Sequence, residues 1–133
     1  MLGKYHTIAI DGCHVHSFDY EHCEHCLARE EKKGKKRWFH AKLQASLVTA
    51  TGLCLPMANE WIENEKDYIK QDCELRAFYR LIKTLRKQYS RLPMCILLDG
   101  LYAAEPAFKA MKEESMEWCV VFKEGSMSFI YSW

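Results

Sequence analysis

The fold of this chain is decided by Met94-Cys95-Ile96-Leu97-Leu98-Asp99-Gly100, a continuous apolar run that ends in an acid and a glycine. Such a run is typical of a central strand that is buried on both faces of a sheet. A second run, Ile8-Ala9-Ile10-Asp11-Gly12, ends in the same two residues. Because a helical segment separates the two runs, we expect parallel, neighbouring strands with a right-handed connection. Asp11 and Asp99 then lie at the same edge of the sheet, where ligands bind in open α/β sheets.

Further elements are predicted from the periodicity of the apolar residues. Residues 37–47 alternate apolar and polar side chains, which predicts a half-buried strand. A β-like run over 53–62 contains Pro56, which lacks a backbone donor, so we expect this strand at an edge of the sheet. The other predicted elements are a strand over 5–10, a helix over 66–91 with an apolar stripe, a helix over 105–114 and a strand over 118–122.

Length and composition restrict the class of protein. A chain of 133 residues suits one domain, and 49% apolar with 28% charged residues excludes a disordered or fibrous protein. The predicted order, β-β-β-α-β-α-β, indicates an α/β fold with a five-stranded mixed sheet and a Cys/His-rich insertion at about residues 13–36. The first residues, Met1-Leu2-Gly3-Lys4-Tyr5-His6, lack the apolar stretch typical of a signal peptide, and no apolar run approaches the roughly 20 residues that a membrane helix requires. The chain is therefore expected in the cytoplasm without a membrane partner.

The two strand-end acids predict a metal site. Two aspartates held a few ångströms apart repel each other unless a cation lies between them. Mg²⁺ takes carboxylate and phosphate oxygens, and a pair of such ions stabilises both the attacking and the leaving oxygen of a phosphoryl transfer. Glu74, on the core-facing side of the long helix near its start, is a third candidate. The alternative is that each Asp-Gly pair only ends a strand and that Glu74 is a rim residue favoured by the helix dipole.

Several short segments occur in the order of a known family. They are Ile8-Ala9-Ile10-Asp11-Gly12, His22-Cys23-Glu24-His25-Cys26, Gln71-Asp72-Cys73-Glu74 with Arg80-Leu81, Leu97-Leu98-Asp99-Gly100-Leu101-Tyr102-Ala103 and Phe122-Lys123-Glu124-Gly125. With these segments, which span nearly the whole chain, the sequence resembles the catalytic domain of bacterial insertion-sequence transposases of the DDE type. Domains of that family have a ribonuclease H-like fold.

The resemblance implies a function and a substrate. Asp11 and Asp99 are then the first two acids of a triad that binds Mg²⁺ or Mn²⁺, and Glu74 is a supporting ligand. The implied substrates are transposon ends and target DNA, cut by water and joined through a 3′ hydroxyl at the nucleoid of a bacterial cell. The family's third acid lies on a helix after the last strand, for which this chain is too short. The resemblance therefore predicts a C-terminally incomplete domain over 1–133, inactive alone, and leaves a homodimer open.

Cysteine and histidine residues in the insertion suggest a second metal. Cys23 and Cys26 have the C-x₂-C spacing of a zinc half-site. We name His22 and His25 as completing ligands, although His14, His16 and His40 are also available. Thiolate and imidazole suit Zn²⁺ better than Mg²⁺, so this ion is expected to be structural and to order the insertion. A redox pair or incidental thiols are the alternatives.

A basic cluster beside Trp38 is a candidate for contacts with DNA phosphates; its members are Lys32, Lys33, Lys35, Lys36 and Arg37. The alternative is an ordinary solvated loop. Two other functions also fit the sequence. One is a ribonuclease H-like nuclease whose site is completed by Glu74, and the other is a zinc-stabilised nucleic-acid-binding remnant without catalysis.

Overall fold

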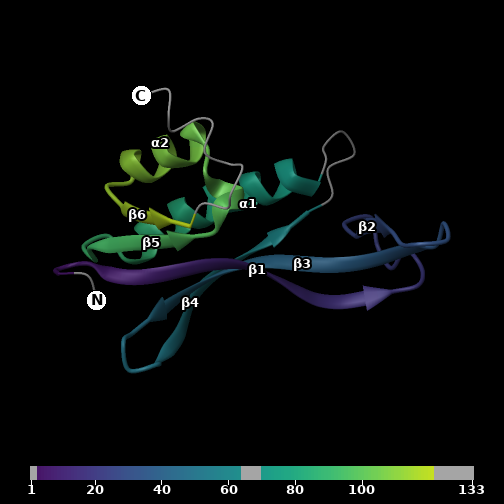
Figure 1. The fold of residues 1–133 in the computed structure, drawn as a ribbon, viewed down its shortest axis with the longest axis horizontal. Coiled ribbons are helices and arrows are strands. Elements are labelled where there is room, and N and C mark those ends of the chain that lie inside the picture. The colour runs from purple at the N-terminus through teal and green to yellow at the C-terminus, as the bar shows by residue number, and fades with distance from the viewer. Residues whose placement is uncertain (1–2, 64–69, 122–133) are drawn as a thin grey trace.

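Six strands of the described residues form one mixed sheet, and two helices lie together on one face of it (Figure 1). The computed structural model describes residues 3–63 and 70–121. The elements in chain order are β1 (His6–Phe18), β2 (Leu27–Glu30), β3 (Lys36–Val48), β4 (Cys54–Ile62), α1 (Lys70–Gln88), β5 (Met94–Leu98), a 3₁₀ turn (Gly100–Tyr102), α2 (Glu105–Glu113) and β6 (Glu117–Val120).

The sheet is built around β1, which pairs antiparallel with β3 and parallel with β5. β5 in turn pairs parallel with β6. The other edge of β3 carries both β2 and β4 in antiparallel pairing. The strand order is β2-β3-β1-β5-β6, with β4 beside β3. The predicted α/β class, the mixed sheet and the parallel pairing of β1 with β5 are thereby confirmed.

The core lies between the sheet and the apolar stripe of α1. Phe78, Leu81 and Leu85 are fully buried on that stripe. They belong to the same cluster as Ile8 on β1 and Ile96 on β5. Because each such side chain contributes about 1.5–3 kcal/mol when it is buried, the stripe determines which side of α1 faces the sheet.

The structure corrects the prediction for residues 11–36. β1 does not end at Asp11 but continues to Phe18, and β2 is an additional strand, so the sheet has six strands instead of five. The pairing of β1 with β3 extends to Phe18 opposite Trp38, with a register shift between His14 and His16. Most side chains in this half of β1 are exposed. No apolar period therefore marks it in the sequence, and backbone pairing with β3 holds it instead.

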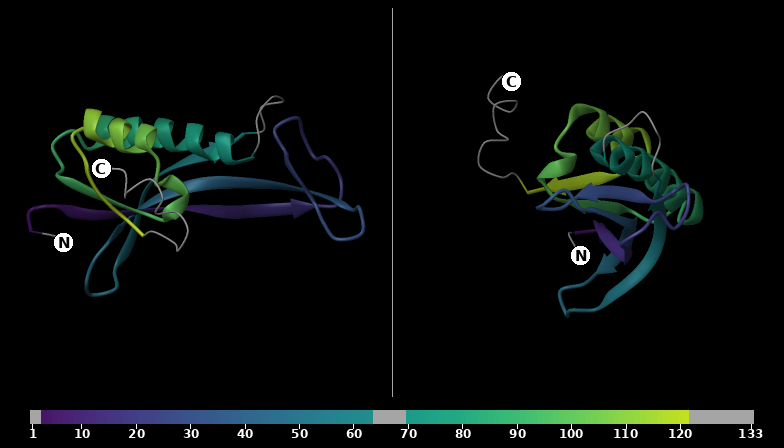
Figure 2. Two further views of the ribbon diagram at one scale, coloured as in Figure 1. Left: turned by 45° about the horizontal axis from the view of Figure 1, so that its top comes forward. Right: turned by 90° about the vertical axis from the view of Figure 1, so that its right-hand side faces the viewer.

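The distal halves of β1 and β3 extend past the helices and carry β2 at their far end (Figures 1 and 2). We call residues 13–40 the arm. Its strands are continuous with those of the core, so the arm and the core share one sheet. The predicted insertion is therefore an extension of the sheet.

The remaining elements agree with the sequence where the structure describes them. β5 coincides with the apolar run, and β4, which carries Pro56, pairs only with β3 among the described residues. Residues 66–69 of the predicted helix and residues 122–125, with the last family segment, lie outside the described residues. Within the described ranges, no helix combines the length and the apolar composition needed to cross a bilayer.

Candidate functional site

The three acids predicted to bind a metal line one cavity of about 200 Å³. Asp11 comes from β1, Glu74 from the first turns of α1 and Asp99 from the residue that follows β5. The other lining residues are Gly12, His14, Ala41, Ile62, Leu101 and Tyr102. We call this the carboxylate cavity. The parallel pairing of β1 and β5 brings Asp11 and Asp99 to it, and the packing of α1 brings Glu74.

Local hydrogen bonds orient two of these carboxylates. Asp99 caps the 3₁₀ turn, and its Oδ1 accepts a hydrogen bond of 2.8 Å from the backbone N–H of Leu101. Oδ1 of Asp11 accepts one of 2.9 Å from the N–H of Gly12. A carboxylate oxygen that accepts a backbone N–H is held in one orientation. Both carboxylates are therefore oriented by the local backbone.

Tyr102 lines the same cavity, and its pKa is affected by the three acids. Its side chain is buried at 3% exposure, and its ring centroid lies 5.0 Å from that of Phe78. Burial raises the pKa of the Tyr102 phenol, and the negative charges of Glu74, Asp99 and Asp11 raise it further, in that order of size. The phenol consequently stays neutral at physiological pH. The three acids that add to the rise in this pKa form a negatively charged lining that attracts a cation.

A tighter set of metal-binding side chains lies in the arm. One ligand atom from each of His22, Cys23, Cys26 and His40 lies within 4.8 Å of all the others, which makes this group able to hold a metal ion. We call it the Cys/His cluster. Asp11, Glu74 and Asp99 do not form a group of this tightness in the described part of the chain.

The distances within the Cys/His cluster can be compared with those of a tetrahedral zinc site. The two sulfur atoms lie 3.8 Å apart, and Nε2 of His40 lies 3.6 Å from Sγ of Cys23 and 3.5 Å from Sγ of Cys26. Ideal Zn–S and Zn–N bond lengths in a tetrahedron place two sulfurs about 3.8 Å apart and a sulfur and a nitrogen about 3.6 Å apart. The three separations therefore leave room for a zinc ion at the centre.

Backbone structure places these ligands. Cys23 and Cys26 are joined by a turn in which the N–H of Cys26 donates to the carbonyl of Cys23 at 3.2 Å. His40 lies on β3 directly after Phe39, on the face opposite the buried Phe39 side chain. The ring of His22 stacks on Phe18 at 4.8 Å and meets the ring of His40 edge-on at 6.0 Å.

The prediction that His25 is a zinc ligand is not supported, because His40 and not His25 belongs to the Cys/His cluster. His25 lies outside the Cys/His cluster, with a side chain 57% exposed and its Nε2 3.4 Å from Oε1 of Glu24. The reason is geometric, because His25 is inside the tight turn that brings Cys23 and Cys26 together. His40 is distant in sequence, and its place on the polar face of the alternating run over 37–47 was the one local feature that could have favoured it.

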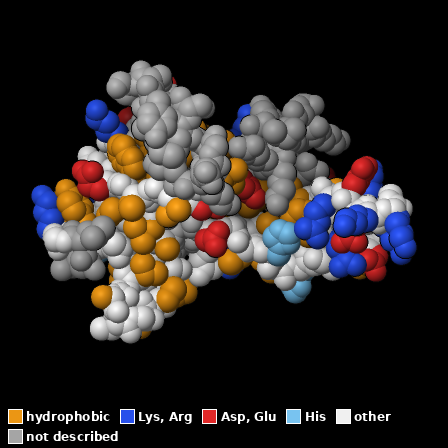
Figure 3. All heavy atoms as spheres, in the orientation of Figure 1, with side chains coloured by type: hydrophobic (Ala, Val, Ile, Leu, Met, Phe, Trp, Pro, Cys, Tyr) orange, Lys and Arg blue, Asp and Glu red, His pale blue; other side chains and the backbone are white. Residues whose placement is uncertain are grey.

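The predicted DNA-binding residues lie at the far end of the arm, where Figure 3 shows blue side chains gathered. Lys32, Lys33, Lys35 and Lys36 are exposed. Arg37 is half-buried and forms ion pairs with Glu31 at 3.3 Å and Asp19 at 3.5 Å. Arg37 is therefore engaged within the arm, unlike the four lysines around it.

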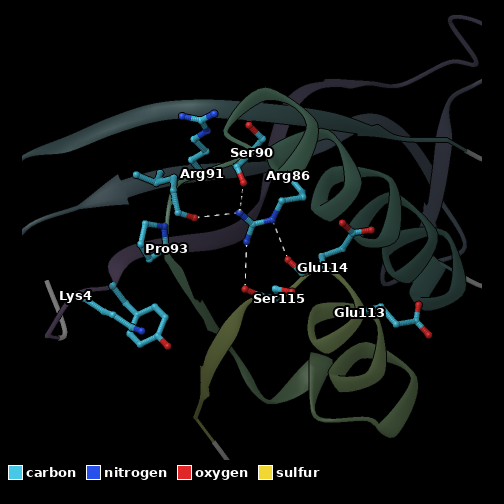
Figure 4. Close-up of a pocket in the computed structure, with 10 residues that line it drawn as sticks. Lys4, Arg86, Ser90, Arg91, Pro93, Glu113, Glu114 and Ser115 are labelled. Carbon is cyan, nitrogen blue, oxygen red and sulfur yellow. Dashed lines mark hydrogen bonds between the residues drawn. The ribbon is translucent and has the colours of Figure 1, made fainter.

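A larger cavity, of about 450 Å³, lies at the opposite end of the molecule, between the end of α1 and the turn after α2 (Figure 4). Its central guanidinium, that of Arg86, donates to five backbone carbonyls; these belong to Tyr89, Ser90, Leu92, Glu114 and Ser115. Since these contacts engage its donors, Arg86 joins two segments of the fold instead of presenting a charge to a ligand. None of the predicted site residues lines this cavity.

Within residues 3–63 and 70–121, the candidate metal-binding side chains gather in the carboxylate cavity and the Cys/His cluster. The first offers hard oxygen ligands, and the second offers sulfur and nitrogen ligands. A scan against protein-family models and a search of curated proteins find no match for this chain. The carboxylate cavity and the Cys/His cluster are therefore the features of this protein that indicate a function.

Proposed function

We propose that this chain is a metal-dependent phosphoryl-transfer domain that acts on DNA, with a ribonuclease H-like fold similar to that of DDE-type transposases. The observation that carries the proposal is the convergence of Asp11, Glu74 and Asp99 on one cavity, next to the point where the parallel pairing of β1 with β5 ends. The order of the acids along the chain and their elements agree with the resemblance seen in the sequence.

The residues of the carboxylate cavity suit Mg²⁺ or Mn²⁺. Both ions prefer oxygen ligands from one or two carboxylates and complete their coordination with water and phosphate oxygens. Asp11 and Asp99 supply oriented carboxylates, and Glu74 adds a third negative charge. When bound, the ion neutralises charge on the phosphate and lowers the pKa of the attacking water.

The protein residues have separate roles in this proposal. Asp11 on β1 and Asp99 directly after β5 hold the ion, and Glu74 supports it from α1. The neutral phenol of Tyr102, whose pKa is raised by burial and by these acids, adds no charge to the cavity. The substrates proposed from the resemblance are transposon ends and target DNA.

Changing either aspartate to asparagine is expected to weaken the binding of a divalent cation at this site. Asp11→Asn and Asp99→Asn keep the shape of the side chain but remove its charge. We expect the Kd for Mn²⁺, measured by isothermal titration calorimetry on the zinc-loaded chain, to rise at least about tenfold in each variant, since 1.4 kcal/mol corresponds to that factor. Glu113→Gln, an exposed acid on α2, is the matched control and should bind Mn²⁺ as the wild type does. Equal Kd values in all four proteins, or no heat from the wild type, would contradict the proposal.

We further propose that the Cys/His cluster holds a structural Zn²⁺. The sulfur and nitrogen separations fit the edges of a zinc-centred tetrahedron, and two thiolates with two neutral imidazoles balance the charge of the ion. The sulfur atoms, 3.8 Å apart, are well beyond the roughly 2 Å bond of a disulfide. Four protein ligands leave no open position for substrate, so the ion has a structural role. This observation favours the second candidate function, a zinc-stabilised nucleic-acid-binding module.

A further inference from the structure

We propose that the arm is a separate binding site for double-stranded DNA, in which the zinc ion clamps a β-ribbon whose lysine tip contacts phosphates. The inference rests on the zinc proposed above but does not require catalysis at the carboxylate cavity. Four observations carry it: the shape of the tip, the pairing of its charges, the position of the Cys/His cluster and the distance from the core.

The tip is a tight turn that presents four lysines. Lys32, Lys33, Lys35 and Lys36 flank or occupy the turn between β2 and β3. The turn is closed by backbone hydrogen bonds from Glu31 to Lys35 at 2.8 Å and from Gly34 to Glu31 at 3.2 Å. Lys33 and Gly34 both have positive φ, 83° and 74°. A lysine in this left-handed conformation is unusual, and the turn displays it at the outermost point of the ribbon.

Two acids in the arm, Glu31 and Asp19, pair with arginines and not with these lysines. Glu31 lies 3.3 Å from Arg37 and 3.7 Å from Arg29, and Asp19 lies 3.5 Å from Arg37. Among the described residues, the ion pairs found do not include any of the four tip lysines. The arginines therefore hold the arm together, while the lysines carry positive charge that is available to a partner.

The Cys/His cluster closes the base of the same ribbon. Cys26 directly precedes Leu27, the first residue of β2, and His40 directly follows Phe39, to which Leu27 is paired. β2 makes only four pairs with β3, ending at Glu30 opposite Lys36. β3 pairs with β1 only as far as Trp38, so from there to the tip the ribbon consists of β2 and β3 alone. A two-stranded ribbon is marginally stable in water. A zinc ion that joins Cys23 and Cys26 to His40 therefore supplies the constraint that keeps the tip in place.

The shape and charge of the ribbon suit a DNA duplex. The major groove of B-DNA is wide enough to admit a two-stranded β-ribbon, and phosphates line both of its edges. Because the ribbon lies beyond the helices at the end of the arm, nothing else in the described fold covers its tip (Figures 1 and 3). Contacts of lysine with phosphate give affinity without sequence preference.

The test measures the binding of a fluorescein-labelled DNA duplex, about one or two helical turns long, to the zinc-loaded chain. Binding is monitored by fluorescence anisotropy at several salt concentrations and in the absence of Mg²⁺. Four phosphate contacts predict a slope of about −3.6 for log affinity against log salt. The variant Lys32→Gln, Lys33→Gln, Lys35→Gln, Lys36→Gln should lose at least about tenfold in affinity and most of this slope. The control removes the same charge from exposed positions on the two helices; it changes Lys83, Lys87, Lys109 and Lys112 to Gln and should bind like the wild type.

Zinc dependence is tested in the same assay with Cys23→Ser, whose affinity should fall as far as that of the tip variant. If zinc is present and the tip variant binds like the wild type, the inference is overturned while the zinc proposal stands. If the wild type holds no zinc, the zinc proposal fails and the inference fails with it. Tighter binding of a single-stranded RNA than of the duplex also overturns it, because the partner is then of another class.

Discussion

Replacing Cys26 with serine is expected to reduce the zinc content of the purified chain from about one ion to almost none, because a serine hydroxyl does not replace the thiolate ligand. Cys26 is the most buried member of the Cys/His cluster, at 1% exposure, and its Sγ lies within 3.8 Å of both Cys23 Sγ and His40 Nε2. Elemental analysis by mass spectrometry measures the zinc. Substitution of Co²⁺ provides a second readout, since tetrahedral sulfur and nitrogen ligation gives visible absorption bands that the variant should lack.

Loss of this ion should affect the arm far more than the core. Structural zinc contributes on the order of 10 kcal/mol in small zinc-binding domains, and here the residues around the cluster have few other constraints. Amide hydrogen exchange in Cys26→Ser is expected to accelerate over residues 19–30 and to stay unchanged in β5 and the buried part of α1. Cys54→Ser, at an exposed position on β4, is the control and should keep its zinc. Zinc retained by Cys26→Ser, or equal exchange throughout both variants, would show that the cluster is not the metal site.

Replacing Arg86 with leucine is expected to lower the free energy of unfolding by about 3 kcal/mol, because hydrogen bonds from a charged donor contribute about 1.5–3 kcal/mol each and are not additive. The shortest of these hydrogen bonds runs from Nε to the carbonyl of Glu114 at 2.8 Å (Figure 4). Another runs from Nη1 to the carbonyl of Leu92 at 3.1 Å. The guanidinium thus joins the end of α1 to the turn between α2 and β6. Chemical denaturation measures the difference.

The neighbouring Arg91 provides a matched control for this prediction. It lines the same cavity and is exposed, so Arg91→Leu should change the free energy of unfolding by no more than about 0.5 kcal/mol. Arg86→Lys should fall between the two, since an ammonium group keeps the charge but lacks the planar set of donors that spans two segments. Equal destabilisation by Arg86→Leu and Arg91→Leu would contradict the structural role of Arg86.

Much of the core could be predicted because burial leaves a clear pattern in the sequence. β5 is an uninterrupted apolar run between Pro93 and Asp99, and its limits were predicted correctly. The parallel pairing of β1 and β5 followed from the helical connection between them. The distal half of β1 and the short β2 were missed, because pairing with β3 uses backbone groups and places no demand on side-chain hydrophobicity.

The candidate sites also contain some features that could be predicted from the sequence and others that could not. Asp11 and Asp99 could be placed in one cavity from strand topology alone, whereas the choice between His25 and His40 required the path of the chain around Cys23 and Cys26. Nearness in sequence favoured His25, and only the pairing of β3 with β1 and β2 brings His40 to the sulfur atoms. The ion pairs of Arg37 with Glu31 and Asp19 likewise depend on the folded arrangement of the arm, so no local sequence pattern indicates them.

The register shift in β1 links the two sites to one another. His14 lines the carboxylate cavity, and His16, on the other side of the shift, lines a cavity of about 330 Å³ beside the Cys/His cluster. β1 therefore contributes a histidine beside each of the two candidate metal sites, and Val15 is the extra residue at the register shift between them. In a regular strand, two residues separated by one other residue point to the same face, but the extra residue places His14 opposite Ala41 and His16 opposite His40, on opposite faces of the sheet. The bulge therefore lets a single strand present one histidine to each of the two sites.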